Sequence, residues 1–119
     1  MGRYLIQAAY TPDSWTALVQ QPENRPTPVR RMVERAGGRL ECFYLSFGDY
    51  DIVSIAEFPD NASAAAVSIA ASAGRGIKTI RTTPLLSVEE TIGALTKAQV
   101  LEYEPPGHGT GMQTPMYAG

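Results

Sequence analysis

The stretch Phe47-Gly48-Asp49-Tyr50-Asp51 separates two runs rich in aromatic and β-branched residues, 39–47 before it and 50–58 after it. Two such runs around a short segment that contains glycine predict a β-hairpin. A glycine at the first central position of a two-residue loop supplies the positive φ that a type II′ turn requires. We therefore predict a loop of Gly48 and Asp49, with Tyr50 opening the second strand, and assign these three residues a structural role in the turn.

The faces of this hairpin follow from the position of the loop. A loop at Gly48 and Asp49 pairs Leu45 with Ile52 and Tyr44 with Val53, and alternate pairs share one face of a sheet. We expect helices of the same chain to cover one face and a partner subunit to cover the other, because both faces are apolar. One face carries Phe43, Leu45, Phe47, Tyr50 and Ile52, and the other carries Leu40, Cys42, Tyr44, Val53 and Ile55, with Ser46, Asp51 and Glu57 at its margins.

The rest of the chain alternates extended and helical patterns. Thr11 followed by Pro12 is typical of a helix start, and Pro22 interrupts that helix. Thr27 is the expected cap of a second helical segment, and either Asp60 or Asn61 is the expected cap of the helix after the hairpin. The predicted strands are 3–10, 39–47, 50–58 and 77–86, and the predicted helices begin near residues 11, 27, 62 and 87.

This order is β-α-β-β-α-β followed by one more helix, which is the split βαβ, ferredoxin-like arrangement of the α+β class. It predicts one antiparallel sheet with both crossover connections on one face. The other face is then free to pack against the sheet of a second copy. We expect residues 1–103 to form this domain, and residues 104–119, which are rich in Gly and Pro, to form an extended tail.

Composition excludes several classes of function. The formal net charge is −2, and no basic stripe is present to neutralise phosphates, so we expect no nucleic-acid partner. No segment approaches the roughly 20 apolar residues of a membrane span, and the N-terminal residues lack a signal-peptide pattern. A single cysteine, Cys42, permits no intramolecular disulfide, so the cytoplasm is the expected compartment.

Four segments, 37–40, 43–51, 57–60 and 80–90, carry a resemblance to a known family. The second of them contains Gly48-Asp49-Tyr50-Asp51 and resembles the Gly-Tyr-Asp signature for which the GYD-domain family is named. The resemblance extends over about residues 3–97. It implies a dimeric α/β-barrel fold, similar to that of small monooxygenases and stress-responsive barrel proteins, and it implies no particular reaction.

Four residues are candidate ligand contacts. Tyr44, Ser46 and Asp51 lie together at one margin of the hairpin, and Trp15 adds aromatic surface for an apolar pocket. A carboxylate at the rim of a covered face can act as a base or bind a cationic group. The alternative for Asp51 is structural, since it can accept hydrogen bonds from turn amides or Ser46. Tyr44 and Trp15 are also compatible with a place in the core.

The sequence offers little support for a catalytic or metal centre. His108 is the only histidine, and it lies in the Gly/Pro-rich tail, away from the predicted domain. No His/Cys/Asp/Glu cluster has the spacing of metal ligands, and Cys42 has no histidine in the folded part to serve as its base. We therefore assign no catalytic residue and predict neither a metal nor a cofactor.

Three functions remain open at this stage. The leading hypothesis is a homodimeric or larger module that binds a small apolar molecule between the helices and the sheet or in the centre of a barrel. The alternative is a cofactor-free enzyme of the oxygenase or isomerase type, with Asp51 or Tyr44 as the acid–base group. The third is a purely structural subunit, for which the subunit interface would be dry and fully packed.

Overall fold

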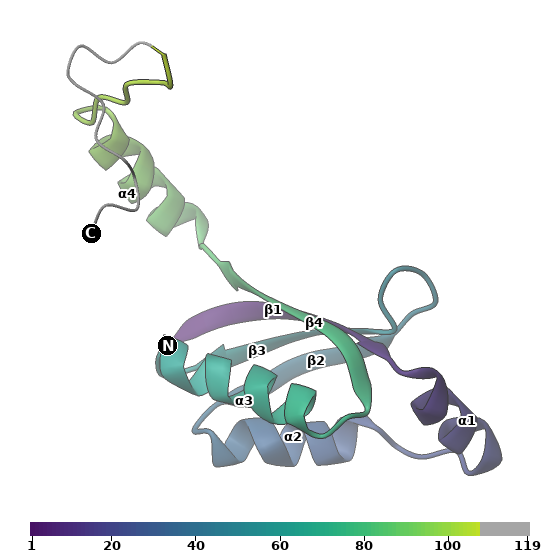
Figure 1. Ribbon diagram of the computed structural model, residues 1–119. Coiled ribbons are helices and arrows are strands. Elements are labelled where there is room, and N and C mark those ends of the chain that lie inside the picture. The colour runs from purple at the N-terminus through teal and green to yellow at the C-terminus, as the bar shows by residue number, and fades with distance from the viewer. Residues whose placement is uncertain (108–119) are drawn as a thin grey trace. The chain divides into compact units, whose positions relative to one another are not determined.

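The computed structural model describes residues 1–107, in one unit formed by Met1–Leu86 and a second that begins at Ser87 (Figure 1). The predicted order of the elements is confirmed. The first unit contains β1 (Gly2–Tyr10), α1 (Pro12–Gln20), α2 (Pro26–Arg35), β2 (Arg39–Leu45), β3 (Ile52–Phe58), α3 (Asn61–Ala73) and β4 (Ile77–Leu85), and the second contains α4 (Val88–Ala98).

The first unit has the predicted α+β, ferredoxin-like architecture. Its strands form one sheet in the order β2-β3-β1-β4, and every neighbouring pair is antiparallel. Helices α2 and α3 lie on the same face of this sheet (Figure 1). That face is called the helix face below, and the opposite one is called the open face.

Two helices begin as the sequence predicts. The side chain of Thr11 accepts a hydrogen bond from the Ser14 N–H at 3.1 Å, with Pro12 in the first turn of α1. The Asp60 carboxylate accepts the Ser63 N–H at 2.8 Å at the start of α3. Hydrogen bonding to Ser63, mainly to its backbone N–H, lowers the pKa of the Asp60 carboxyl below its usual value.

Helix α2 begins differently from the prediction, because Thr27 is not its cap. The helix already begins at Pro26, since the fixed φ of proline suits the first turn and its missing N–H has no partner to lose there. The Asn24 side chain accepts the Thr27 N–H at 3.3 Å instead. At the other end, Gly37 has a φ of +84°, and the Gly38 N–H donates to the Val33 carbonyl at 2.9 Å. This is the glycine C-terminal motif that the sequence predicts.

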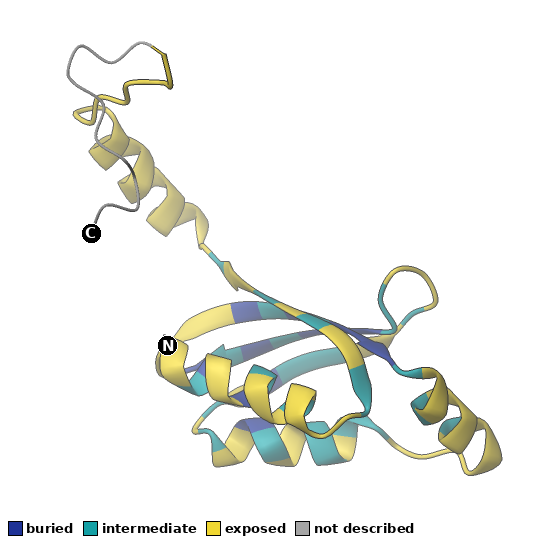
Figure 2. Cartoon of the chain, in the orientation of Figure 1, coloured by how far each residue is buried: buried dark blue, intermediate teal, exposed yellow. Residues whose placement is uncertain are grey.

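The core lies between the helix face and helices α2 and α3, as the dark blue strand segments show (Figure 2). Residues of β3 alternate between buried and half-buried along its whole length. The Tyr4 and Phe58 rings meet edge to face with centroids 5.6 Å apart. The buried residues of this cluster are Tyr4, Ile6, Val33, Leu40, Ala56, Phe58, Ala64 and Val67.

The hairpin keeps the predicted register but not the predicted turn. Leu45 pairs with Ile52 and Tyr44 with Val53, as expected. The two-residue type II′ loop is wrong, because β2 ends at Leu45, β3 begins at Ile52, and Gly48 does not have a positive φ. Residues 46–51 form a wider loop, on which Phe47 is fully exposed instead of facing the sheet.

A β-bulge overturns the predicted position of Leu40. Leu40 pairs with Ala56 and Cys42 pairs with Ile55, so Glu41 is an extra residue in β2. An extra residue reverses the alternation of faces on one side of it. Leu40 therefore points to the helix face, where it is 7% exposed, and does not share a face with Cys42.

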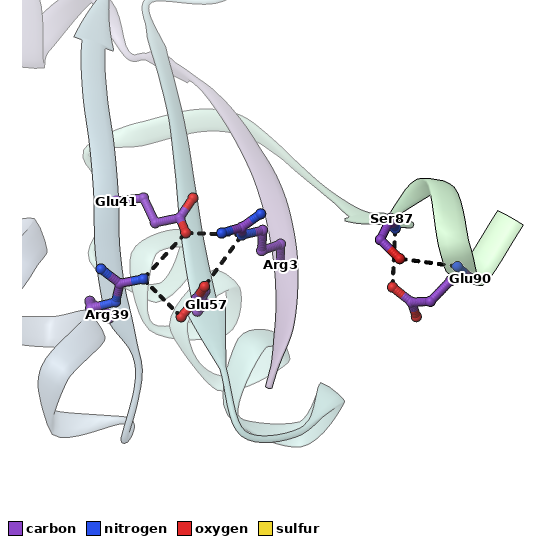
Figure 3. Close-up of polar contacts among 6 residues, drawn as sticks. All are labelled: Arg3, Arg39, Glu41, Glu57, Ser87 and Glu90. Atoms are coloured by element: carbon purple, nitrogen blue, oxygen red, sulfur yellow. Dashed lines mark hydrogen bonds and ion pairs between the residues drawn. The ribbon is translucent and has the colours of Figure 1, made fainter.

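In the second unit, α4 begins with a capping box at Ser87 and Glu90. The Ser87 hydroxyl accepts the Glu90 N–H at 3.0 Å, and the Glu90 carboxylate accepts the Ser87 N–H at 3.1 Å (Figure 3). All residues of α4 are exposed, including Val88, Ile92 and Leu95. Of the predicted tail, residues 104–107 are exposed and non-helical, and His108 lies outside the described residues.

Candidate functional site

A cavity of about 380 Å³ lies between the sheet and the helices of the first unit. Its floor is the helix face of the sheet, to which all four strands contribute. The middle of this floor is apolar apart from one serine, Ser54, which is 2% exposed. The floor residues include Ile6, Ala8, Phe43, Ile52, Ser54 and Ile80.

Helices α1, α2 and α3 provide the other walls. The wall from α3 is built of small side chains, because this helix consists mostly of alanine and serine. Small side chains leave space between a helix and a sheet, where larger ones would fill it. The helical wall residues include Ala17, Leu18, Val29, Met32, Ala70 and Ala71.

Few polar side chains reach the cavity. Ser14 lines it, but its hydroxyl donates to the Gly76 carbonyl at 2.8 Å and is satisfied. Tyr10, at the end of β1, lines it with a ring that contacts Trp15 edge to face, at a centroid distance of 5.2 Å. The Tyr10 hydroxyl is buried and has no hydrogen-bond partner within residues 1–107. It is thus an unsatisfied polar group at an otherwise apolar site.

A charged pair from the α1–α2 connection also lines the cavity. Arg25 Nη1 donates to Glu23 Oε1 at 3.1 Å, and their side chains are 30% and 53% exposed. Burial lowers the pKa of the Arg25 guanidinium, but the Tyr10 hydroxyl and the Glu23 carboxylate outweigh that effect and raise the pKa above its usual value. Arg25 is therefore a permanent cation beside the Tyr10 hydroxyl.

The predicted contact Asp51 ties the hairpin loop to β1. Its carboxylate accepts the Tyr10 N–H at 2.9 Å, and its own N–H donates to the Ala8 carbonyl at 2.8 Å. Ser46 lies beside it, and its hydroxyl donates to the Tyr50 carbonyl at 2.6 Å. The Ser46 N–H also donates to the Asp51 carbonyl at 2.8 Å, so Asp51 joins the base of the hairpin loop to β1.

The other two predicted contacts lie elsewhere. Tyr44 is on the open face and 67% exposed, and Trp15 is on α1 and 38% exposed. Neither they nor Ser46 and Asp51 are among the described residues that line the cavity. The structure thus brings Ser46 and Asp51 together at the loop, and Tyr10 contacts both Asp51, through its backbone N–H, and Trp15, through its ring. The role of all four as ligand contacts stays a prediction.

Sequence reasoning missed the polar residues that do line the cavity, Tyr10, Glu23 and Arg25. Tyr10 is the last residue of β1, and whether its side chain is buried depends on helices that follow it in the sequence. The available signal was Arg25, a charged residue between Pro22 and Pro26 in a segment that must pass the edge of the core. A long cation confined by prolines next to a core is a candidate ligand contact.

The open face carries a second polar group of residues at one end. Arg3 Nε donates to Glu41 Oε1 at 2.9 Å and Glu57 Oε1 at 3.3 Å, and Arg39 Nη2 lies 3.1 Å from Glu57 Oε2 (Figure 3). Hydrogen bonds, of which that from Arg39 has the largest effect, lower the pKa of Glu57. The negative charge of Glu41 is the main cause that raises the pKa of Arg3. The charges of this ion-pair network are thus compensated within the chain.

Beyond this network, the part of the open face that β2 and β3 form with Leu5 is largely apolar, whereas β1 and β4 add the polar residues Gln7, Arg81 and Thr83. Leu5 pairs with Ile55, and Gln7 pairs with Val53. On β2, Cys42 pairs with Ile55 and Tyr44 pairs with Val53, so they lie beside these two pairs on the same face. Leu5, Cys42, Val53 and Ile55 are all only partly buried in the single chain.

The described residues contain no group of three or more His, Cys, Asp or Glu side chains that is arranged to hold a metal ion. Within the same part of the chain, no helix has the length and apolar character needed to cross a membrane.

No curated protein matches the chain. A family model, that of the GYD domain, matches residues 4–95. This match spans most of β1, all of β2, β3 and β4, the hairpin loop and most of α4. The chain therefore belongs to the GYD-domain family.

Proposed function

We propose that this chain is a small-molecule-binding protein that takes an apolar ligand into the cavity between the sheet and helices α1, α2 and α3. The cavity itself carries the proposal. Its volume of about 380 Å³ and its mainly apolar walls are typical of ligand sites, which usually occupy about 300–1,000 Å³ and contain few polar groups. A purely structural subunit has no need for such a space, since protein cores are normally close-packed.

Filling the cavity is expected to abolish this binding. In Ala71→Phe, a large ring replaces a methyl group on the α3 wall and occupies the space of the ligand. We expect the affinity for 1-aminonaphthalene, a neutral probe that is small enough for the cavity and whose fluorescence responds to apolar surroundings, to fall by at least about tenfold, which corresponds to about 1.4 kcal/mol. Fluorescence titration of the wild type and the variant measures the change.

Ala66→Phe is the matched control for this experiment. Ala66 is on the same helix, is exposed and does not line the cavity. This variant should bind the probe like the wild type. Binding that is absent from the wild type, or that Ala71→Phe and Ala66→Phe leave equally unchanged, would refute a ligand site in the cavity.

We also propose that the protein is a homodimer or a larger homo-oligomer, in which open faces of two copies pack against each other. The partly buried apolar residues Leu5, Val53 and Ile55 support this, because neighbouring apolar side chains on an uncovered sheet face commonly mark an interaction site. The ion-pair network supports it too, since charges already paired within one chain cost less to bury than isolated ones. In such an assembly Tyr44 lies at the subunit interface.

A charge in the middle of the open face is expected to dissociate the assembly. Ile55→Glu places a carboxylate without a partner in the proposed interface, and burying such a charge costs several kcal/mol. The dissociation constant should rise by roughly a hundredfold or more, measured by sedimentation equilibrium. The matched control is Val19→Glu on α1, where the valine is 78% exposed. A wild-type protein that stays monomeric, or equal effects of the two variants, would exclude an assembly through this face.

A further inference from the structure

We propose that the ligand of the cavity is an apolar carboxylic acid, whose carboxylate is held between the Tyr10 hydroxyl and the Arg25 guanidinium; this rests on the binding function proposed above. The apolar walls take the hydrocarbon part of the molecule. The polar groups from β1 and the α1–α2 connection take its charged end.

The Tyr10 hydroxyl is buried without a partner, which supports this proposal. Tyr10 is 5% exposed, its ring lines the cavity, and its hydroxyl has no hydrogen-bond partner within residues 1–107. Buried hydroxyl groups in proteins are nearly always hydrogen-bonded. An unpaired one beside a cavity therefore indicates that a ligand atom completes the bond.

The chemistry of Arg25 decides what kind of atom this is. Arg25 lines the same cavity as Tyr10. A guanidinium has donors only, so it has no use for the hydroxyl proton, which still requires an acceptor. Two donors, one of them permanently positive, select a negatively charged acceptor, and a carboxylate fits the planar fork of arginine.

Glu23 shows that a carboxylate fits beside this guanidinium. It accepts from Arg25 at 3.1 Å while its own side chain remains 53% exposed. A ligand carboxylate would therefore compete with Glu23 for the Arg25 guanidinium. An exposed ion pair of this kind contributes little to stability, so the exchange is not costly. Glu23 is thus an internal competitor of the ligand.

The dimensions of the cavity limit the size of the acid. At about 30 Å³ of liquid volume per non-hydrogen atom, as in water, a cavity of about 380 Å³ holds about a dozen such atoms. A medium-chain fatty acid such as decanoate has this size. Decanol has the same chain without the charge, which makes the two a matched pair of probes.

The test is competition of decanoate and decanol for 1-aminonaphthalene bound to the full-length protein. Charge-assisted hydrogen bonds are roughly twice as strong as neutral ones, so decanoate should displace the probe at a concentration at least about tenfold lower than decanol. Tyr10→Phe and Arg25→Met should each weaken decanoate binding much more than decanol binding and so reduce this preference. Glu23→Gln, which removes the competing charge, should strengthen decanoate binding several-fold.

The possible outcomes separate the two proposals. If the probe binds and decanol displaces it as well as decanoate does, the acid is wrong and the cavity remains an apolar site. The same holds if Tyr10→Phe binds decanoate like the wild type. If the probe does not bind at all, the cavity proposal fails first. Tyr10→Phe deletes only an unpaired hydroxyl, so an unchanged melting temperature confirms that this variant folds.

Discussion

Replacing Phe58 by alanine is expected to lower the free energy of unfolding by about 3–5 kcal/mol. Phe58 is 0% exposed and lies at the end of β3, within the main core cluster. Its ring also contacts Tyr4 edge to face, an arrangement worth about 0.5–1.5 kcal/mol beyond simple burial. Since a domain of this size is typically stable by only about 5–15 kcal/mol, the loss takes a large share of the total.

Urea denaturation followed by the fluorescence of Trp15, the only tryptophan, measures this change. Phe47→Ala is the matched control, because the same ring is removed from a side chain that is 100% exposed in the hairpin loop. The control should change stability by less than about 0.5 kcal/mol. A cost below about 1 kcal/mol for Phe58→Ala would mean that the core between the sheet, α2 and α3 is not packed as described.

The second large effect is expected for Gly38→Ala, with a loss of about 3 kcal/mol or more. A methyl group at this position would overlap the Glu57 carbonyl oxygen and lie 2.7 Å from Cδ1 of Phe58. The backbone of β3 cannot move away without disturbing the sheet, so the overlap cannot be relieved by a change of rotamer. Only glycine fits at residue 38, because the chain that leads into β2 passes very close to the backbone of β3 there.

Gly48→Ala provides the comparison for this variant. Gly48 has no positive φ, and an added methyl group at this residue has no neighbour within 4 Å. Its replacement should therefore leave the urea midpoint nearly unchanged. If Gly48→Ala proved as damaging as Gly38→Ala, the loop would have the tight type II′ geometry that the sequence predicts, and the loop described for residues 46–51 would be wrong.

Local sequence patterns predict much of this fold because their causes are local. The caps Thr11, Asp60 and Ser87 each act within one helical turn, so the identity of the residue and its near neighbours are sufficient. The pairing of Leu45 with Ile52 is equally accessible, since the two strands are adjacent in sequence. The Leu40 error has a different origin: the extra residue Glu41 shifts the pairing of β2 with β3, and the alternation of residue types along β2 does not reveal this shift.

The amino-acid sequence by itself determined the order of the elements, the ferredoxin-like class and the family, because hydrophobic periodicity, caps and glycines act over short distances along the chain. Only the tertiary structure decided where the candidate site lies. Tyr10 and Arg25 come together with the alanine-rich wall of α3 through packing of separate elements on one face of the sheet. The tertiary structure also decided the role of Asp51, because its carboxylate accepts the Tyr10 N–H of β1, a group that is distant in sequence and adjacent in space.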